Sequence, residues 1–233
     1  MGPNSCKNAF VTPDDSSNTT PKPRQDIDAV VFDHDGTLVD SESITLGVIA
    51  EFAAEAGAEI YPEDIDRYVG ADLHVVFAEI ERRSGKPLPE NTLTQFRIRQ
   101  TARIEAGLKE IPGAHRLLSA LSLPFAIASN APHAKMELCL GATDLQRFFT
   151  KDRMISAYDL QAWKPDPAIF LRAAEVLGVE PAKCAAVEDS RPGLEAAIAA
   201  GMQVFALDPE DRFTDLVGVT RVATLDALHP YLT

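Results

Sequence analysis

Short apolar runs alternate with helical segments through the second half of the chain, and this alternation restricts the fold more than any other feature. Apolar runs at 124–129, 153–156, 184–187 and 203–206 have the length of buried strands, and a β-branched run at 27–32 precedes them. Strands joined by helices form parallel sheets with right-handed crossovers and helices on both faces. The sequence therefore predicts an α/β protein with a Rossmann-like parallel sheet. The helices expected between these strands lie at 114–121, 167–177 and 193–200, with one more after Pro132.

The segment at 43–110 has a different character, because it contains helical patterns and no strand signal. Its expected helices lie at 44–57, 64–69, 72–84 and 92–109. We therefore predict an α/β core domain formed by 26–42 and 111–233, with a helical cap domain at 43–110 inserted after the first strand. Residues 1–25 are rich in Ser, Thr, Asn, Asp and Pro and are predicted to be a disordered tail.

The charge and the cysteine content exclude several classes of function. The 233 residues include 35 acidic and 22 basic ones, so the formal net charge is −13, which disfavours nucleic acid and anionic lipid as partners. Three cysteines without CxxC spacing form neither a disulfide framework nor a zinc site. No apolar run approaches the ~18 residues of a membrane span. We expect a cytoplasmic protein, a monomer or weak dimer, that acts on a small molecule.

Polar side chains follow four of the predicted strands or their connecting loops. Because the carboxyl ends of parallel strands meet at one edge of a sheet, we expect these side chains to converge there. In chain order they are Asp33, Asp35, Ser129, Asn130, Lys164, Glu188 and Asp189.

Four carboxylates at one edge would repel one another without a cation, so the sequence predicts a divalent metal held by Asp33, Asp35, Glu188 and Asp189. Oxygen ligands favour Mg²⁺, whereas zinc would require His or Cys. Lys164 adds a compact positive charge that suits a phosphate oxygen. A metal and a lysine together indicate phosphoryl chemistry.

The spacing of Asp33 and Asp35 suits a covalent reaction. One carboxylate can attack phosphorus, and a second acid two residues later can protonate the leaving oxygen and then activate water. Gly36 permits a close approach of the backbone, and the Ser129 hydroxyl can donate to a phosphoryl oxygen.

These segments resemble the four motifs of the haloacid dehalogenase superfamily of phosphotransferases. The matching segments are FDHDGTLVDSE at 32–42, IASN at 127–130, WKPDPAIF at 163–170 and VEDSRPGLEAA at 187–197. The segment at 43–110 resembles the small helical cap of the family. The resemblance implies that Asp33 is the nucleophile, and that Asp35 is the general acid and base and a magnesium ligand through its carbonyl. It further implies that Ser129 and Lys164 bind phosphate and that Glu188 and Asp189 hold Mg²⁺. We expect Asn130 to be a substrate-binding residue with Ser129 and Lys164.

Two subfamilies of this superfamily remain as alternatives. The second aspartate disfavours dehalogenation, which leaves a sugar-phosphate phosphatase or a β-phosphoglucomutase. The mutases have a histidine where this chain has Thr45 and an arginine where it has Leu73, so the phosphatase is favoured. SNAPHAKM at 129–136 and YDLQAWKPDP at 158–167 are similar to segments of bacterial 6-phosphogluconate phosphatases. A cap that selects a sugar acid needs basic residues, and the candidates left open are Arg67, His74, Arg97, Arg99 and Arg103.

Overall fold

The structure is a computed structural model that describes residues 26–59 and 73–233. The expected tail at 1–25, the expected helix at 64–69 and Arg67 lie outside the described residues.

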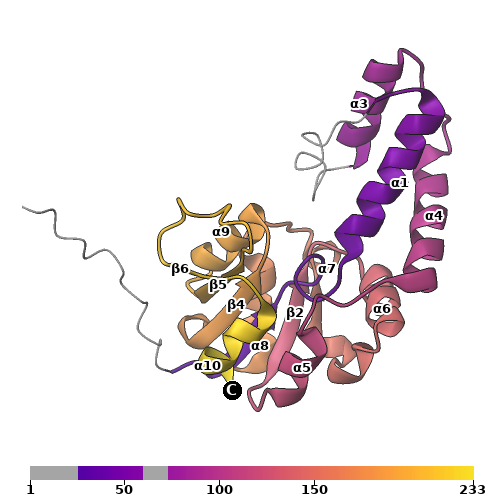
Figure 1. Cartoon of the computed structure of the whole chain (residues 1–233). Helices are drawn as coiled ribbons and strands as arrows, with labels where there is room; N and C mark the ends of the chain where they lie inside the picture. The colour runs from indigo at the N-terminus through magenta and orange to yellow at the C-terminus, as the bar shows by residue number, and fades with distance from the viewer. Residues whose placement is uncertain (1–25, 60–72) are drawn as a thin grey trace, which may run out of the picture.

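A six-stranded, entirely parallel sheet forms the centre of the core (Figure 1). The strand order is β3-β2-β1-β4-β5-β6. The chain first proceeds outward from β1 through β2 to β3, then returns to the other side of β1 with β4. This reversal opens a crevice at the carboxyl ends of β1 and β4, where open α/β sheets bind their ligands. The strands are β1 (Ala29–Phe32), β2 (Phe125–Ser129), β3 (Met154–Ser156), β4 (Cys184–Glu188), β5 (Gln203–Leu207) and β6 (Val219–Val222).

Helices cover both faces of the sheet, as the alternating pattern predicts. Along β1, Val30 and Phe32 point into one apolar cluster, and Ala29 and Val31 point into the other. All four residues are fully buried, which explains why this strand reads as an uninterrupted apolar run. The helices around the sheet are α5 (Ala114–Ala120), α6 (His133–Ala142), α7 (Ala157–Leu160), α8 (Ala168–Leu177), α9 (Arg191–Ala199) and α10 (His229–Leu232).

Three further helices form what we call the helical lobe: α1 (Ser41–Ala56), α3 (Leu73–Ser84) and α4 (Thr92–Gly107). The lobe stands apart from the sheet and joins the core beside α6 and α7 (Figure 1). It has its own apolar cluster, in which the rings of Phe52, Phe77 and Phe96 lie 5.8–6.3 Å apart between centroids. Among the described helices, none combines the length and apolar character that crossing a bilayer demands.

Candidate active site

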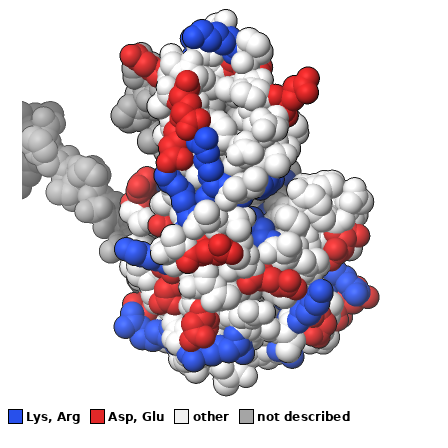
Figure 2. All heavy atoms as spheres, turned by 90° about the vertical axis from the view of Figure 1, so that its right-hand side faces the viewer, with Lys and Arg blue, Asp and Glu red and all other residues white. Residues whose placement is uncertain are grey.

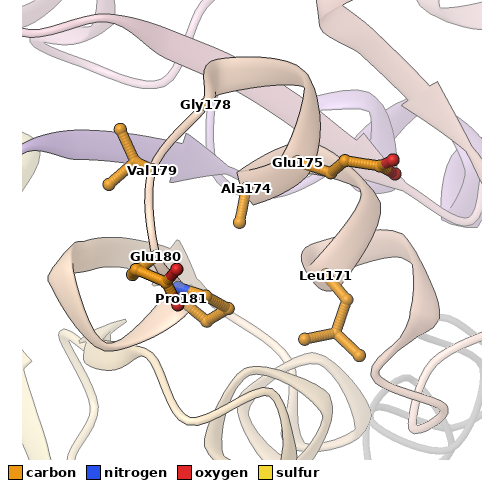
Figure 3. Close-up of a pocket in the computed structure, with 7 residues that line it drawn as sticks. All are labelled: Leu171, Ala174, Glu175, Gly178, Val179, Glu180 and Pro181. Atoms are coloured by element: carbon orange, nitrogen blue, oxygen red, sulfur yellow. The ribbon is translucent and has the colours of Figure 1, made fainter.

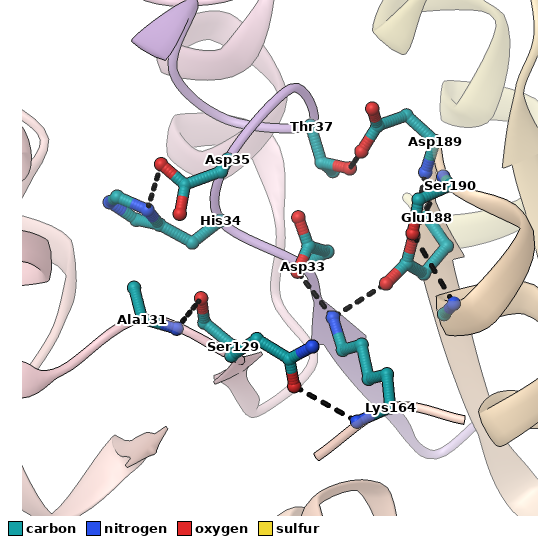
Figure 4. A network of polar contacts seen from close by, with 12 residues as sticks. Asp33, His34, Asp35, Thr37, Ser129, Ala131, Lys164, Glu188, Asp189 and Ser190 are labelled. Atoms are coloured by element: carbon teal, nitrogen blue, oxygen red, sulfur yellow. Dashed lines mark hydrogen bonds and ion pairs between the residues drawn. The ribbon is translucent and has the colours of Figure 1, made fainter. Parts of the chain in front are cut away.

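The carboxyl ends of β1 and β4 place three acidic side chains next to one another (Figure 4). Asp33 directly follows β1, Glu188 is the last residue of β4, and Asp189 follows it. The backbone N–H of Asp33 donates to the carbonyl of Val187 at 2.9 Å, which fixes the two strand ends in register. The acids therefore lie in the crevice that the strand order creates.

One carboxylate oxygen from each of Asp33, Glu188 and Asp189 lies within 4.8 Å of the other two, and all three residues are buried. The donor set consists of oxygen alone, which fits Mg²⁺ better than zinc, whose sites are usually built from His and Cys. Gly36 has a φ of +85°, and a Cβ there would overlap the carboxylate of Asp189. A glycine is therefore required for the loop after β1 to pass so close to the acids.

Lys164 connects two of these acids. Its Nζ donates to Oδ1 of Asp33 and, at 2.5 Å, to Oε1 of Glu188. Burial lowers the pKa of Lys164, but Asp33 and Glu188 outweigh burial and raise it overall, so the ammonium keeps its charge. Oδ1 of Asn130 accepts the backbone N–H of Lys164 at 2.9 Å, so Asn130 holds the segment that carries the lysine.

The cluster has more negative charge than one lysine can neutralise. Burial raises the pKa of Asp33 to about 8, and Glu188 contributes to that rise. Burial, followed by the charge of Glu188, also raises the pKa of Asp189 well above its usual range. Glu188 is held by the backbone N–H groups of Asp189 and Ser190 and by the hydroxyl of Ser190, each at 2.9 Å. A bound divalent cation would supply the missing positive charge.

Asp35 is placed differently from the other acids. We expected its carboxylate to join them, but its Oδ1 lies 2.8 Å from Nζ of Lys135 and 3.3 Å from Nδ1 of His34, and accepts a hydrogen bond from Ser41. Burial raises the pKa of Asp35, but Lys135 and then His34 outweigh burial and lower the pKa well below its usual range. The side chain of Asp35 is therefore held apart from the acidic cluster, and the lowered pKa favours its ionised form.

Ser129 ends β2 and is 1% exposed at the same edge of the sheet. Its Oγ accepts the backbone N–H of Ala131 at 3.0 Å, so it orders the turn between β2 and α6. The hydroxyl proton is not committed by that bond and can be donated to a ligand.

Lys135 and Thr37 also belong to the site, although the sequence analysis did not identify them. Oγ1 of Thr37 donates to Oδ1 of Asp189 at 2.8 Å and thereby orients that carboxylate. Lys135 lies in the first turn of α6, where the helix dipole disfavours a cation. The contact with Asp35 offsets this cost. A lysine in the first turn of a helix could have indicated an anionic partner, but not which one.

A surface groove elsewhere in the core lies between the end of α8 and the loop before β4 (Figure 3). Leu171, Ala174 and Val179 line it together with the acidic Glu175 and Glu180. The groove is at the amino-terminal end of β4, opposite the end that carries Glu188. None of its lining residues is basic, so it does not suit a phosphate.

Comparisons with known proteins agree with this geometry. Residues 27–201 match the family model described as "haloacid dehalogenase-like hydrolase". The chain is 36% identical over 190 residues to 6-phosphogluconate phosphatase of Escherichia coli K12, a match that covers 80% of this chain and 86% of that protein. It is 30% identical over 190 residues to "Phosphorylated carbohydrates phosphatase" of Thermotoga maritima, covering 76% and 83% respectively. The structure of ATU0790, a haloacid dehalogenase-like protein of unknown function from Agrobacterium tumefaciens, superposes with a TM-score of 0.70 at 33% identity, covering 88% of this chain and 90% of that one.

Proposed function

We propose a function for this chain from an established premise: it belongs to the haloacid dehalogenase-like hydrolase family. The chain is a phosphatase, and its similarity to phosphatases of phosphorylated carbohydrates supports sugar phosphates as substrates. We propose more specifically that it hydrolyses phosphomonoesters of small sugars and sugar acids, such as 6-phosphogluconate, with Mg²⁺ and through an aspartyl-phosphate. The observation that carries this proposal is the contact of Lys164 with both Asp33 and Glu188 inside the acidic cluster.

Asp33 is the proposed nucleophile. Its carboxylate oxygen forms a bond to phosphorus while the bond from phosphorus to the sugar oxygen breaks. Lys164 neutralises charge on the phosphoryl group, and the hydroxyl of Ser129 donates to one of its oxygens. The product of this step is an aspartyl-phosphate on Asp33 and a free sugar alcohol.

Asp35 is the proposed general acid for that step and the general base for the next. To donate its proton to the sugar oxygen, its side chain must leave Lys135 and turn toward Asp33. Leaving Lys135 removes the charge that holds the pKa of Asp35 low, so the same movement makes protonation of Asp35 more favourable. Asp35 then removes a proton from the water that attacks phosphorus and releases phosphate from Asp33.

Asp33, Glu188 and Asp189 are the side chains that would hold Mg²⁺, with the backbone carbonyl of Asp35 as a further proposed ligand. The ion, when bound, neutralises the transferring phosphoryl group and keeps Asp33 ionised. We further propose that the helical lobe acts as a cap that excludes water while the phosphoryl group moves to Asp33.

The side chain of Thr45, at the junction with the lobe, favours hydrolysis over a mutase reaction, in which phosphate moves between two positions of a sugar. Thr45 stands where the mutases have a histidine. Its hydroxyl donates a hydrogen bond to the carbonyl of Ser41 at 2.9 Å and accepts one from Nε2 of Gln100 at 2.8 Å. Thr45 thus joins two helices of the lobe and, as a hydroxyl, offers no general base for a sugar hydroxyl.

Phosphate release from a panel of sugar phosphates and phosphorylated sugar acids, with and without Mg²⁺, tests the proposed function. We expect magnesium-dependent release of inorganic phosphate. Conversion of β-glucose 1-phosphate to glucose 6-phosphate with little free phosphate would instead identify a mutase. No reaction with any substrate of the panel would contradict both the phosphatase and the mutase.

A further inference from the structure

Basic side chains gather at the level where the helical lobe meets the core (Figure 2). Most of the described arginines of the lobe are engaged with acids of the lobe itself. Arg99 donates to both carboxylate oxygens of Glu55, at 2.7 and 3.0 Å, and Arg103 pairs with Glu51. Such pairs neutralise one another, so neither arginine is available to an anionic ligand without losing its acid.

Arg97 differs from these arginines. Among the described residues it pairs with no carboxylate, and its hydrogen bond goes to the neutral side chain of Gln100, from Nη1 to Oε1 at 3.3 Å. Its guanidinium also lies 6.0 Å from the centroid of the Phe96 ring. An exposed arginine without an acid is common on protein surfaces, so this observation alone identifies no site.

The hydrogen bonds around Arg97 provide the second observation, because they continue through three residues to the proposed general acid, Asp35. Gln100 is buried and donates to Thr45, which bonds to Ser41, and the hydroxyl of Ser41 donates to Asp35. Hydrogen bonds through Gln100, Thr45 and Ser41 therefore connect Arg97 to the loop that carries Asp35. Its helix α4 also packs against α6, which carries Lys135.

Lys135 is the second cation at this junction. Its side chain is 21% exposed, and among the described residues Asp35 is its acidic partner. Burial lowers the pKa of Lys135, but Asp35 outweighs burial and raises this pKa overall, and the charge of Arg97 lowers it slightly. If Asp35 turns toward Asp33 to donate its proton, Lys135 is left as a largely buried cation beside Arg97. Two cations on packed helices, neither of them then paired with an acid, favour the binding of an anion between them.

We propose that Arg97 and Lys135 bind the carboxylate of a phosphorylated sugar acid at the end opposite its phosphate. This inference rests on the proposed function and adds the group that selects the substrate. The planar guanidinium of Arg97 suits a carboxylate. When Asp35 turns away from Lys135, the carboxylate of the substrate takes its place as the anionic partner of Lys135. The acidic end of the substrate thereby favours the arrangement in which Asp35 is free to act. A sugar phosphate without a carboxylate provides no anion to replace Asp35 beside Lys135.

Two substrates test this inference: 6-phosphogluconate, and sorbitol 6-phosphate, which has the same carbon chain with CH₂OH in place of the carboxylate. For Arg97→Gln we expect kcat/KM with 6-phosphogluconate to fall about 10- to 100-fold, mainly through KM, as for the loss of a charge-assisted bond. With sorbitol 6-phosphate we expect a change of less than about twofold, which also shows that the variant is folded. Arg97→Lys should restore part of the loss, because it keeps the charge.

Arg99→Gln is the matched control, because it removes an arginine two positions away that is paired with Glu55. We expect it to change neither substrate's kcat/KM by more than about twofold. Equal losses of Arg97→Gln with both substrates, or no loss with either, would overturn the carboxylate subsite while leaving the phosphatase proposal intact. Absence of phosphate release from every sugar phosphate by the unmodified protein would instead refute the proposed function.

Discussion

Nζ of Lys135 lies 2.8 Å from Oδ1 of Asp35 and joins the first turn of α6 to the loop after β1. Removing this lysine would leave the Asp35 carboxylate, which is mostly buried, without its main counter-charge. We expect Lys135→Met to lower the free energy of unfolding by about 1–3 kcal/mol at pH 7, measured by urea denaturation. The control is Lys151→Met, which removes an exposed lysine 3.7 Å from Glu137 and should cost less than about 0.5 kcal/mol. Equal effects of the two variants would show that the contact with Asp35 contributes nothing specific.

Gly36 passes so close to Asp189 that a methyl group should disturb the metal site. Both Gly36 and Gly57 have positive φ, but an added Cβ overlaps Asp189 at the first position and meets nothing within 4 Å at the second. We expect Gly57→Ala to cost about 1 kcal/mol from backbone strain and to leave Mg²⁺ affinity unchanged. Gly36→Ala should cost more and weaken Mg²⁺ binding at least about tenfold, measured by calorimetry. Unchanged Mg²⁺ affinity in Gly36→Ala would argue against Asp189 as a ligand.

Mg²⁺ binding should become tighter as the pH rises. Burial raises the pKa of Asp33 from 3.8 to about 8, so between these values the folded, metal-free protein retains a proton that the unfolded chain has lost. The stability of the metal-free protein therefore falls as the pH rises through this window. Because Mg²⁺ must displace that proton, we expect its affinity to increase from pH 6 to pH 8, by up to about tenfold per pH unit for each proton released. Calorimetry in two buffers of different ionisation enthalpy measures the proton release directly. Equal affinities at both pH values, without proton release, would contradict a proton retained by Asp33 in the metal-free protein.

Cys139 and Cys184 should be inert in the folded protein. Both residues are fully buried. Burial, followed by the charge of Asp35, raises the pKa of Cys139 from 9.0 to about 12, and burial, followed by Asp28, raises that of Cys184 to about 11. Since the folded protein holds both thiols protonated, these groups make it less stable as the pH rises above about 9. We expect iodoacetamide at pH 8 to leave both unmodified in the native protein and to alkylate both in urea, as peptide mass mapping would show. Alkylation in the native protein at the rate of a free thiol would contradict their burial.

The sequence predicted the sheet because a buried parallel strand requires an uninterrupted apolar run. The runs at 124–129 and 184–187 correspond to β2 and β4 within one residue. Strand β6 was not predicted, because it lies at the edge of the sheet and Arg221 within it is exposed. The first helix of the lobe begins at Ser41 rather than at residue 44, because the side chain of Asp40 caps it by accepting the N–H of Ser43. The apolar periodicity starts only at Ile44, so it does not indicate the polar first turn or its cap.

The candidate site was predictable where residues follow strands directly. Asp33, Glu188 and Asp189 converge because β1 and β4 are neighbours in register. The position of the Asp35 side chain was not predictable, because it depends on Lys135, a hundred residues further along the chain. No local sequence pattern predicts that the first turn of α6 lies beside the loop after β1. The charges of Arg97, Arg99 and Arg103 are likewise equivalent in the sequence, and only the packing of α1 against α4 shows which of them pair with Glu51 and Glu55.

Phosphate release by Asp33→Asn is the most direct test of Asp33 as the nucleophile. The variant keeps the shape of the side chain and replaces the nucleophilic carboxylate with an amide, which is a poor nucleophile. We predict that kcat with a sugar phosphate falls at least about 1,000-fold while the melting temperature and the circular dichroism spectrum stay close to those of the unmodified protein. A folded Asp33→Asn protein that retains more than about a tenth of the original kcat would contradict the covalent route through Asp33.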